Sequence, residues 1–169
     1  MKKTFILSLL SLLLISASLT AQNTDRYKAL FIYNFTRYIE WPSNSSPNFI
    51  IGVLGSSSVY SELIPIADKK NVGSQIITIK KFNSAEAVTE CNILFVGSDA
   101  SSQVTSLSAS IESKNTLIIT ERPGLINKGA GINFVLDDGK QRFELSKSNM
   151  AKKGLKVNTQ LMDMAMVVD

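Results

Sequence analysis

The sequence predicts an α/β fold in which a mostly parallel central sheet has helices on both faces and an antiparallel C-terminal hairpin at one margin. The first observation is the run 91–97, CNILFVG, in which four consecutive apolar residues do not alternate with polar ones. Such a strand is covered on both sides, as in the centre of a parallel sheet. The second is the repeated order of apolar strand and helical segment, which is typical of right-handed crossovers. The third is an Asp-Gly turn at 138–139 between two strand-like runs, which predicts the hairpin.

The first residues have the pattern of a cleaved export signal. Lys2 and Lys3 precede an apolar core of about 13 residues, and the small residue Ala21 offers a cleavage point. A membrane-spanning helix takes roughly 18 to 20 residues, so cleavage is favoured over a retained anchor. We therefore expect a signal peptide over 1–21 and a single exported domain over 22–169, which is long enough to bury a core.

The elements of this domain alternate along the chain. Asp25 to Trp41 is expected to form a helix with an aromatic stripe, buried on more than one side, and Pro42 ends it. The basic end of 75–82 suggests an edge strand. The alternation of apolar and polar residues in 141–145 implies that one face of this strand is exposed to solvent. Further strands are predicted over 49–54, 93–96, 116–120 and 131–136. A helix is predicted to follow the turn at 55–58 and to end at residue 68, and further helices are predicted over 85–90, 101–113, 148–153 and 159–168.

Charge and cysteine content limit the partners. The mature part carries 16 Lys and Arg against 14 Asp and Glu, because two of the 18 basic residues lie in the signal. The remaining basic pairs are isolated, so no nucleic-acid partner is expected. Cys91 is the only cysteine, which excludes an internal disulfide. Its place at the start of the central strand favours burial, and a disulfide to a second chain is the alternative.

The chain lacks the residues of common catalytic sites. It contains no histidine, which removes the commonest general base and metal ligand, and one cysteine is too few for an ordinary structural zinc site. There is no nucleophile elbow, phosphate-binding P-loop or dinucleotide fingerprint. The adjacent Asp137 and Asp138 are explained by the hairpin turn. We therefore expect no catalytic residues, no metal and no cofactor, and the chain is not expected to be an enzyme.

A binding site is expected where the parallel strands end. In open parallel sheets, ligands bind beyond the carboxyl ends of the strands, where serine hydroxyls and helix N-terminal amides can hold an anion. The predicted ligand-binding residues are Ser56, Ser57, Ser98, Asp99 and Arg122. The alternative is that the serines only cap helices and that Arg122 faces water.

A protein partner is expected to use a second set of residues. Trp, Tyr and Arg are enriched at binding hot spots. The predicted partner-binding residues are Tyr38, Trp41, Pro42, Arg142 and Glu144. The alternative is that Trp41 and Pro42 form a packed helix stop and that Arg142 pairs within the hairpin.

Five segments together resemble the YfiR family of periplasmic proteins. They are KALFIYNFTRYIEWP at 28–42, IGVLG at 51–55, CNILFVG at 91–97, the run 124–146 that contains GINFVLDDGKQRFELS, and GLKVNTQLMDMA at 154–165. Each motif alone is weak, whereas their order and spacing are specific. The resemblance spans nearly all of the mature chain.

The resemblance implies a non-enzymatic regulator that binds and represses the periplasmic part of an inner-membrane signalling protein. In the best-known members the target is a diguanylate cyclase, so the family controls cyclic di-GMP. The resemblance also implies dimers and sensitivity to oxidation through disulfides. Family members often have a cysteine where this chain has Gly52, so control by an internal disulfide is excluded here. The receptor could equally be a sensor histidine kinase. The alternative function is a periplasmic small-ligand carrier or sensor that uses the carboxyl-edge crevice.

Overall fold

The computed structural model describes residues 24–43, 45–111 and 114–168. The predicted signal peptide over 1–21 lies outside these ranges. None of the helices within them combines the length and the hydrophobicity that a membrane crossing requires.

The described residues build an eight-stranded sheet with the order β10-β8-β7-β6-β5-β2-β4-β3. Neighbouring strands from β4 through β2, β5 and β6 to β7 are parallel. β8 is antiparallel to β7, and β3 is antiparallel to β4. The predicted fold class is therefore confirmed. The strands are β2 Asn48–Leu54, β3 Asn71–Val72, β4 Gln75–Phe82, β5 Ile93–Val96, β6 Leu117–Thr120, β7 Ile132–Asp137, β8 Lys140–Leu145 and β10 Met166–Val167.

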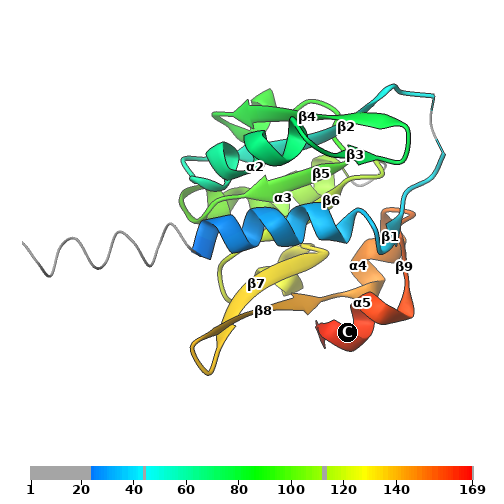
Figure 1. The fold of residues 1–169 in the computed structure, drawn as a ribbon. Coiled ribbons are helices and arrows are strands. Elements are labelled where there is room, and N and C mark those ends of the chain that lie inside the picture. Colours follow the sequence, from blue (N-terminus) through cyan, green and yellow to red (C-terminus); the bar gives the residue numbers. More distant parts are fainter. Residues whose placement is uncertain (1–23, 44, 112–113, 169) are drawn as a thin grey trace, which may run out of the picture.

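The centre of the sheet is the run that the sequence singled out. All four residues of β5 are fully buried, because β2 and β6 flank the strand and both faces of the sheet are covered. One face carries the helix over 24–35, drawn in blue in Figure 1, and α2 Val59–Ala67. Phe35 of the first helix packs edge-on against Phe143 of β8, with ring centroids 5.1 Å apart. Aromatic packing thus fixes the first helix over the sheet.

The other face is covered by shorter helices. The 3-10 helix η2, Ser98–Gln103, leads into α3, Val104–Ser110, and their apolar residues pack on Leu94, Val96 and Ile118 of the sheet. The helices α4 Lys147–Lys152 and α5 Thr159–Met164 add Met150 and Leu161 to the core on the first helix's side. Helices on both faces were predicted, and the structure confirms them.

The first helix is shorter than predicted. It ends at residue 35, and the expected segment up to Trp41 is a turn followed by β1, Ile39–Glu40. Thr36 Oγ1 donates to the carbonyl of Tyr33 at 2.6 Å, which tightens the last turn. β1 then pairs antiparallel with β9, Lys156–Val157, in a separate two-stranded sheet. Pairing with a distant segment overrides the helical periodicity here.

Three other helices are also shorter than predicted. Of the predicted helix over 101–113, only α3, Val104–Ser110, is α-helical, because the residues before it belong to the 3-10 helix η2. The segment 85–90 contains only one 3-10 turn, η1 Ala85–Ala87. The last helix stops at Met164, because Met166 and Val167 form β10 at the sheet margin beside β8. The predicted hairpin is confirmed, and Asp138 and Gly139 adopt left-handed angles of φ 48° and 71° as a tight hairpin turn requires.

Candidate functional site

The carboxyl ends of β2 and β5 are bridged by the exposed side chain of Asp99. These strands are neighbours although β4 lies between them in sequence, so this is the point where ligands usually enter such sheets. The Asp99 carboxylate occupies the space that a Cβ on Gly55 would fill and lies 3.0 Å from the corresponding position on Gly97. The amide of Ser56 donates to Asp99 Oδ2 at 2.9 Å, and this hydrogen bond lowers the pKa of the Asp99 carboxyl.

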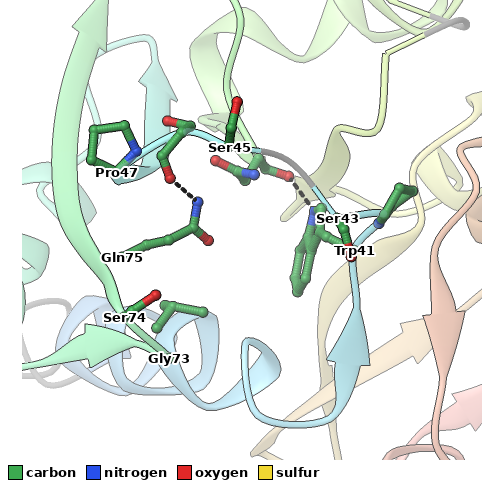
Figure 2. Close-up of a pocket in the computed structure, with 11 residues that line it drawn as sticks. Trp41, Ser43, Ser45, Pro47, Gly73, Ser74 and Gln75 are labelled. Atoms are coloured by element: carbon green, nitrogen blue, oxygen red, sulfur yellow. Dashed lines mark hydrogen bonds between the residues drawn. The ribbon is translucent and has the colours of Figure 1, made fainter.

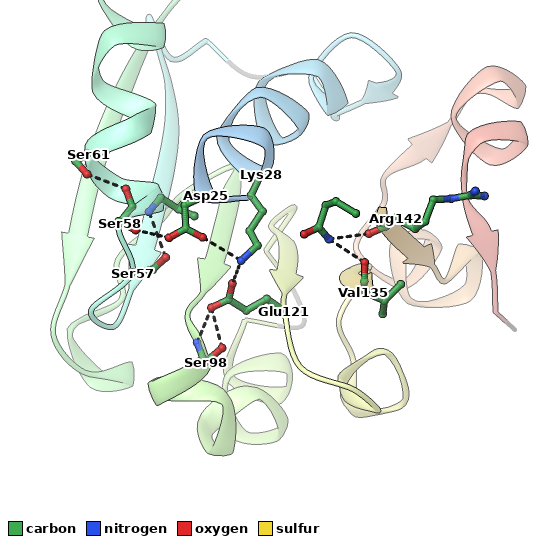
Figure 3. Close-up of polar contacts among 11 residues, drawn as sticks. Asp25, Lys28, Ser57, Ser58, Ser61, Ser98, Glu121, Val135 and Arg142 are labelled. Carbon is green, nitrogen blue, oxygen red and sulfur yellow. Dashed lines mark hydrogen bonds and ion pairs between the residues drawn. The ribbon is translucent and has the colours of Figure 1, made fainter. Parts of the chain in front are cut away.

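A second internal carboxylate lies at the end of β6, as Figure 3 shows. Glu121 Oε1 accepts hydrogen bonds from the amide and the hydroxyl of Ser98, both at 2.9 Å. Its other oxygen lies 2.5 Å from Lys28 Nζ of the first helix, and Lys28 also pairs with Asp25 at 3.0 Å. Asp25 in turn accepts from the hydroxyl of Ser58. This polar network therefore ties the first helix to the carboxyl edge of the sheet.

The charge network raises the pKa of Lys28. Burial alone would lower the pKa of Lys28, but the hydrogen bonds and negative charges of Glu121 and Asp25 outweigh it, so the pKa lies above the ordinary value of 10.5. Lys28 and Glu121 are nearly buried, with side-chain exposures of 12% and 11%. Lys28 is thus held as a cation between the side chains of Glu121 and Asp25.

The predicted ligand-binding residues lie at this edge, but most of their polar groups have internal partners. Ser56 and Ser98 donate to Asp99 and Glu121, and the hydroxyl of Ser57 accepts from the amide of Val59 at the start of α2. Within the described ranges the exposed guanidinium of Arg122 forms no hydrogen bond or ion pair. An external anion could use the amides of Ser56 and Ser98 only by displacing the carboxylates of Asp99 and Glu121.

A hollow at the opposite, amino edge of the sheet was not foreseen from the sequence. Figure 2 shows it between the segment after Trp41 and the turn between β3 and β4. Its volume is about 620 Å³, and its polar and aromatic lining includes Trp41, Ser43, Ser45, Ser74, Gln75 and Asn92. None of the lining residues carries a charge. Three separate chain segments supply them, so no single motif marks the hollow.

Trp41 is partly structural. Its Nε1 donates to the carbonyl of Asn92 at 3.1 Å, and its ring lies edge-on to Phe49 at 5.0 Å. The remainder of its half-buried side chain borders the hollow, next to the exposed Pro42. Tyr38 is half-buried and packs against the core, and its carbonyl accepts from the amide of Asn158.

Arg142 and Glu144 lie on the hairpin, away from Trp41. In Figure 3 the Arg142 side chain extends away from the polar network, and its guanidinium has no hydrogen-bonding or ionic partner among the described residues. Glu144 instead accepts from Asn133 Nδ2 at 2.8 Å. Trp41 precedes β2 and Arg142 lies on β8, and four strand spacings, or about 19 Å, separate these two strands. The structure therefore divides the predicted partner-binding residues into a Trp41 surface, with Tyr38 and Pro42, and an Arg142 surface, with Glu144.

The fold and these sites define an α/β domain in which Asp99 and Glu121 accept the hydrogen bonds of Ser56 and Ser98 at the carboxyl edge of the sheet, and in which Arg122 and Arg142 are exposed. Within the described ranges, no three His, Cys, Asp or Glu side chains gather as a metal site would require. The profile of the YfiR/HmsC-like family matches residues 25–166, and the chain belongs to this family. A search of curated proteins finds no match. The family is regulatory and non-catalytic, and membership points to a periplasmic regulator of signalling proteins.

Proposed function

We propose that this chain is a non-enzymatic periplasmic protein that binds and represses the periplasmic part of an inner-membrane signalling protein. The target is a diguanylate cyclase or a sensor histidine kinase, and in the first case the protein controls cyclic di-GMP. The family match over 25–166 carries this proposal. Cleavage of residues 1–21 and a homodimer belong to the same proposal.

Arg142 offers the clearest docking contact of the two surfaces. Its guanidinium is exposed and has no carboxylate partner among the described residues, so a partner can supply one without breaking an internal bond. Trp41 is a less selective probe, because its removal would also take away the contact with Phe49 and the hydrogen bond to Asn92. Arg142→Glu is therefore the sharper variant.

Affinity capture tests the proposal. The tagged mature domain serves as bait on detergent-solubilised inner membranes from its own source, and mass spectrometry identifies what is retained. We expect a membrane protein with a cyclase or kinase output domain. Arg142→Glu should reduce its recovery about tenfold, because a charge that docks on a partner is reversed.

Arg26→Glu is the matched control, because Arg26 is another exposed arginine and the charge change is the same. Equal recovery with both variants would remove Arg142 from the docking surface. Recovery of no signalling protein by the unmodified domain would contradict the regulatory function itself.

A second candidate function is the binding of a small ligand, and the uncharged hollow favours the amino edge over the carboxyl edge for it. A volume of about 620 Å³ lies within the usual range of ligand pockets. Hydroxyl and amide groups beside an indole suit a neutral polar ligand. Trp41 is the only tryptophan, so its fluorescence reports on this hollow alone. Titration with neutral sugars should change that emission, and Ser74→Phe, which fills the hollow, should abolish the change. Unaltered emission throughout would rule out a sugar site here.

A further inference from the structure

The sheet has an open strand edge at β4. This strand is eight residues long, but β3 pairs only with its first two residues, Gln75 and Ile76. On its other side β4 pairs along most of its length with β2. In Figure 1, β4 lies at the upper margin of the sheet. The second half of β4 therefore has a strand neighbour on one side only.

The hydrogen bonds to β2 show which backbone groups face outward. The amide of Ile76 donates to the carbonyl of Pro47, and the carbonyl of Phe82 accepts from the amide of Gly55. Even-numbered residues of β4 thus face β2. Because alternate residues of a strand turn their backbone groups to opposite sides, the N–H and C=O groups of Ile79 and Lys81 point away from the sheet. Among the described residues no strand pairs with them.

Lysines surround this open edge. Lys80 and Lys81 lie on it, and Lys69 and Lys70 immediately precede β3. Lys69, Lys70 and Lys81 are exposed and Lys80 is half-buried. None of these four ammonium groups has a carboxylate partner within the described ranges, whereas Lys28 and Lys156 do. The edge is therefore a template for an added strand, and its lysines are not paired with carboxylates of the described residues. Lys81 Nζ lies 5.7 Å from the centre of the Tyr60 ring of α2.

We propose that the β4 edge binds an extended, acidic segment of a partner protein, which adds to the sheet as a further strand beside Ile79 and Lys81. Backbone hydrogen bonds supply the affinity and the lysines select acidic residues. Lys80 and Lys81 project to opposite faces, so carboxylates on either face of the added strand meet an ammonium group. The identification of this partner with the signalling receptor rests on the proposed function.

A second copy of this chain does not fit the edge as well. Pairing of two β4 edges would bring the lysines of both copies together, and like charges across strands are destabilising. Lysines on edge strands commonly prevent such self-association. A foreign acidic strand removes this repulsion and satisfies the outward backbone groups.

Amide exchange measured by NMR tests the proposal without the receptor. The probe is a blocked peptide of about eight residues in which glutamate and valine alternate, a length typical of strands. In the free protein the amides of Ile79 and Lys81 should exchange quickly, and those of Thr78 and Lys80 slowly, because the latter bond to β2. Saturating peptide should slow Ile79 and Lys81 about tenfold and leave Thr78 and Lys80 unchanged.

Charge reversal separates strand addition from general attraction. The double variant Lys80→Glu/Lys81→Glu should weaken peptide binding at least about tenfold, whereas Lys128→Glu/Lys147→Glu, at exposed lysines elsewhere, should not. A peptide with lysine in place of glutamate should not bind.

Three results would overturn the proposal. The first is that the peptide does not slow amide exchange at Ile79 and Lys81, and the second is that the lysine peptide binds equally well. The third is that exchange at these amides slows with rising protein concentration in the absence of peptide, because a second copy of the chain would then occupy the edge. Since no receptor is used, these results are independent of affinity capture. If affinity capture fails but the peptide binds, the β4 edge remains a binding site for an acidic strand, and only its assignment to a signalling receptor is rejected.

Discussion

Cys91 shows how burial determines the chemistry of one residue. Its side chain is buried in an apolar cluster, as expected from its position before the central strand. Burial raises the pKa of the Cys91 thiol to about 12. Because the thiolate is the reactive form, the thiol should be nearly inert at neutral pH.

Thiol reactivity therefore distinguishes burial from a disulfide between chains. At pH 8 we expect a disulfide reagent to label native Cys91 at least about 100-fold more slowly than the unfolded chain. Ser74→Cys, at an exposed turn, gives the rate of an accessible thiol. Rapid labelling of Cys91 in the native protein, or a dimer that only a reductant separates, would contradict this.

Only glycine fits at position 52, because the side chains of Phe82 and Leu94 pack closely against it. A Cβ at this position would lie 2.6 Å from Phe82 Cε2 and 3.2 Å from Leu94 Cδ1. Gly52→Ala should therefore lower the free energy of unfolding by about 1–3 kcal/mol, as overpacking does. Denaturant unfolding measures this loss.

A double-variant cycle identifies the contact with Phe82 as the cause. Combined with Phe82→Leu, Gly52→Ala should cost less than it does alone, because the smaller side chain leaves room. If the losses of unfolding free energy for Gly52→Ala and Phe82→Leu simply add in the double variant, the new methyl group does not clash with the Phe82 ring.

At the level of elements, the first helix is attached by charge as well as by aromatic packing. Lys28→Met leaves Glu121 without its cation, and we expect the free energy of unfolding to fall by about 1–3 kcal/mol, less than for a fully buried pair. The exposed pair Lys156–Glu40, with exposures of 77% and 70%, is the control. Lys156→Met should cost no more than about 0.5 kcal/mol.

The contribution of Lys28 depends on pH in a defined direction. Because the pKa of Lys28 is raised on folding, its stabilisation is complete below the ordinary value of 10.5 and is lost as pH rises through the folded value. The difference in unfolding free energy between the parent and Lys28→Met should thus be constant up to about pH 10 and shrink above it. A difference that grows with pH would show that the pair is not the cause.

Elements with strong local signals were predictable, and elements that depend on distant pairing were not. The apolar run of β5 and the Asp138-Gly139 turn each define their structure within a few residues. By contrast, β1 exists because Ile39 pairs with Val157, and β10 because Met166 pairs with Glu144. No local sequence pattern contains those partners, so the helices predicted before β1 and β10 were too long at their C-terminal ends.

At the scale of the molecule, the location of the candidate sites was predictable, whereas their contacts between distant residues were not. The sheet topology placed Ser56, Ser98 and Asp99 at one edge, as expected. The hydrogen bonds of these residues were not predictable, because Asp99 lies 43 residues from Ser56 and Glu121 lies 23 residues from Ser98 in sequence. Similarly, the hollow beside Trp41 is assembled from separate segments, and only the fold brings them together.

The extent of the mature protein can be tested directly. If residues 1–21 are removed on export, the intact mass of the periplasmic protein should correspond to 22–169. N-terminal sequencing should then begin at Gln22. A product that keeps these residues and sediments with membranes would indicate a retained anchor.

The position of Asp99 over Gly55 and Gly97 gives relatives of this chain a readable difference. A family member with glycine or alanine at this position would leave the Ser56 amide without its internal acceptor, and solvent anions could enter the crevice. In this chain the Ser56 amide has the Asp99 carboxylate as its acceptor, so the residue at position 99 decides whether that amide is open to a dissolved anion.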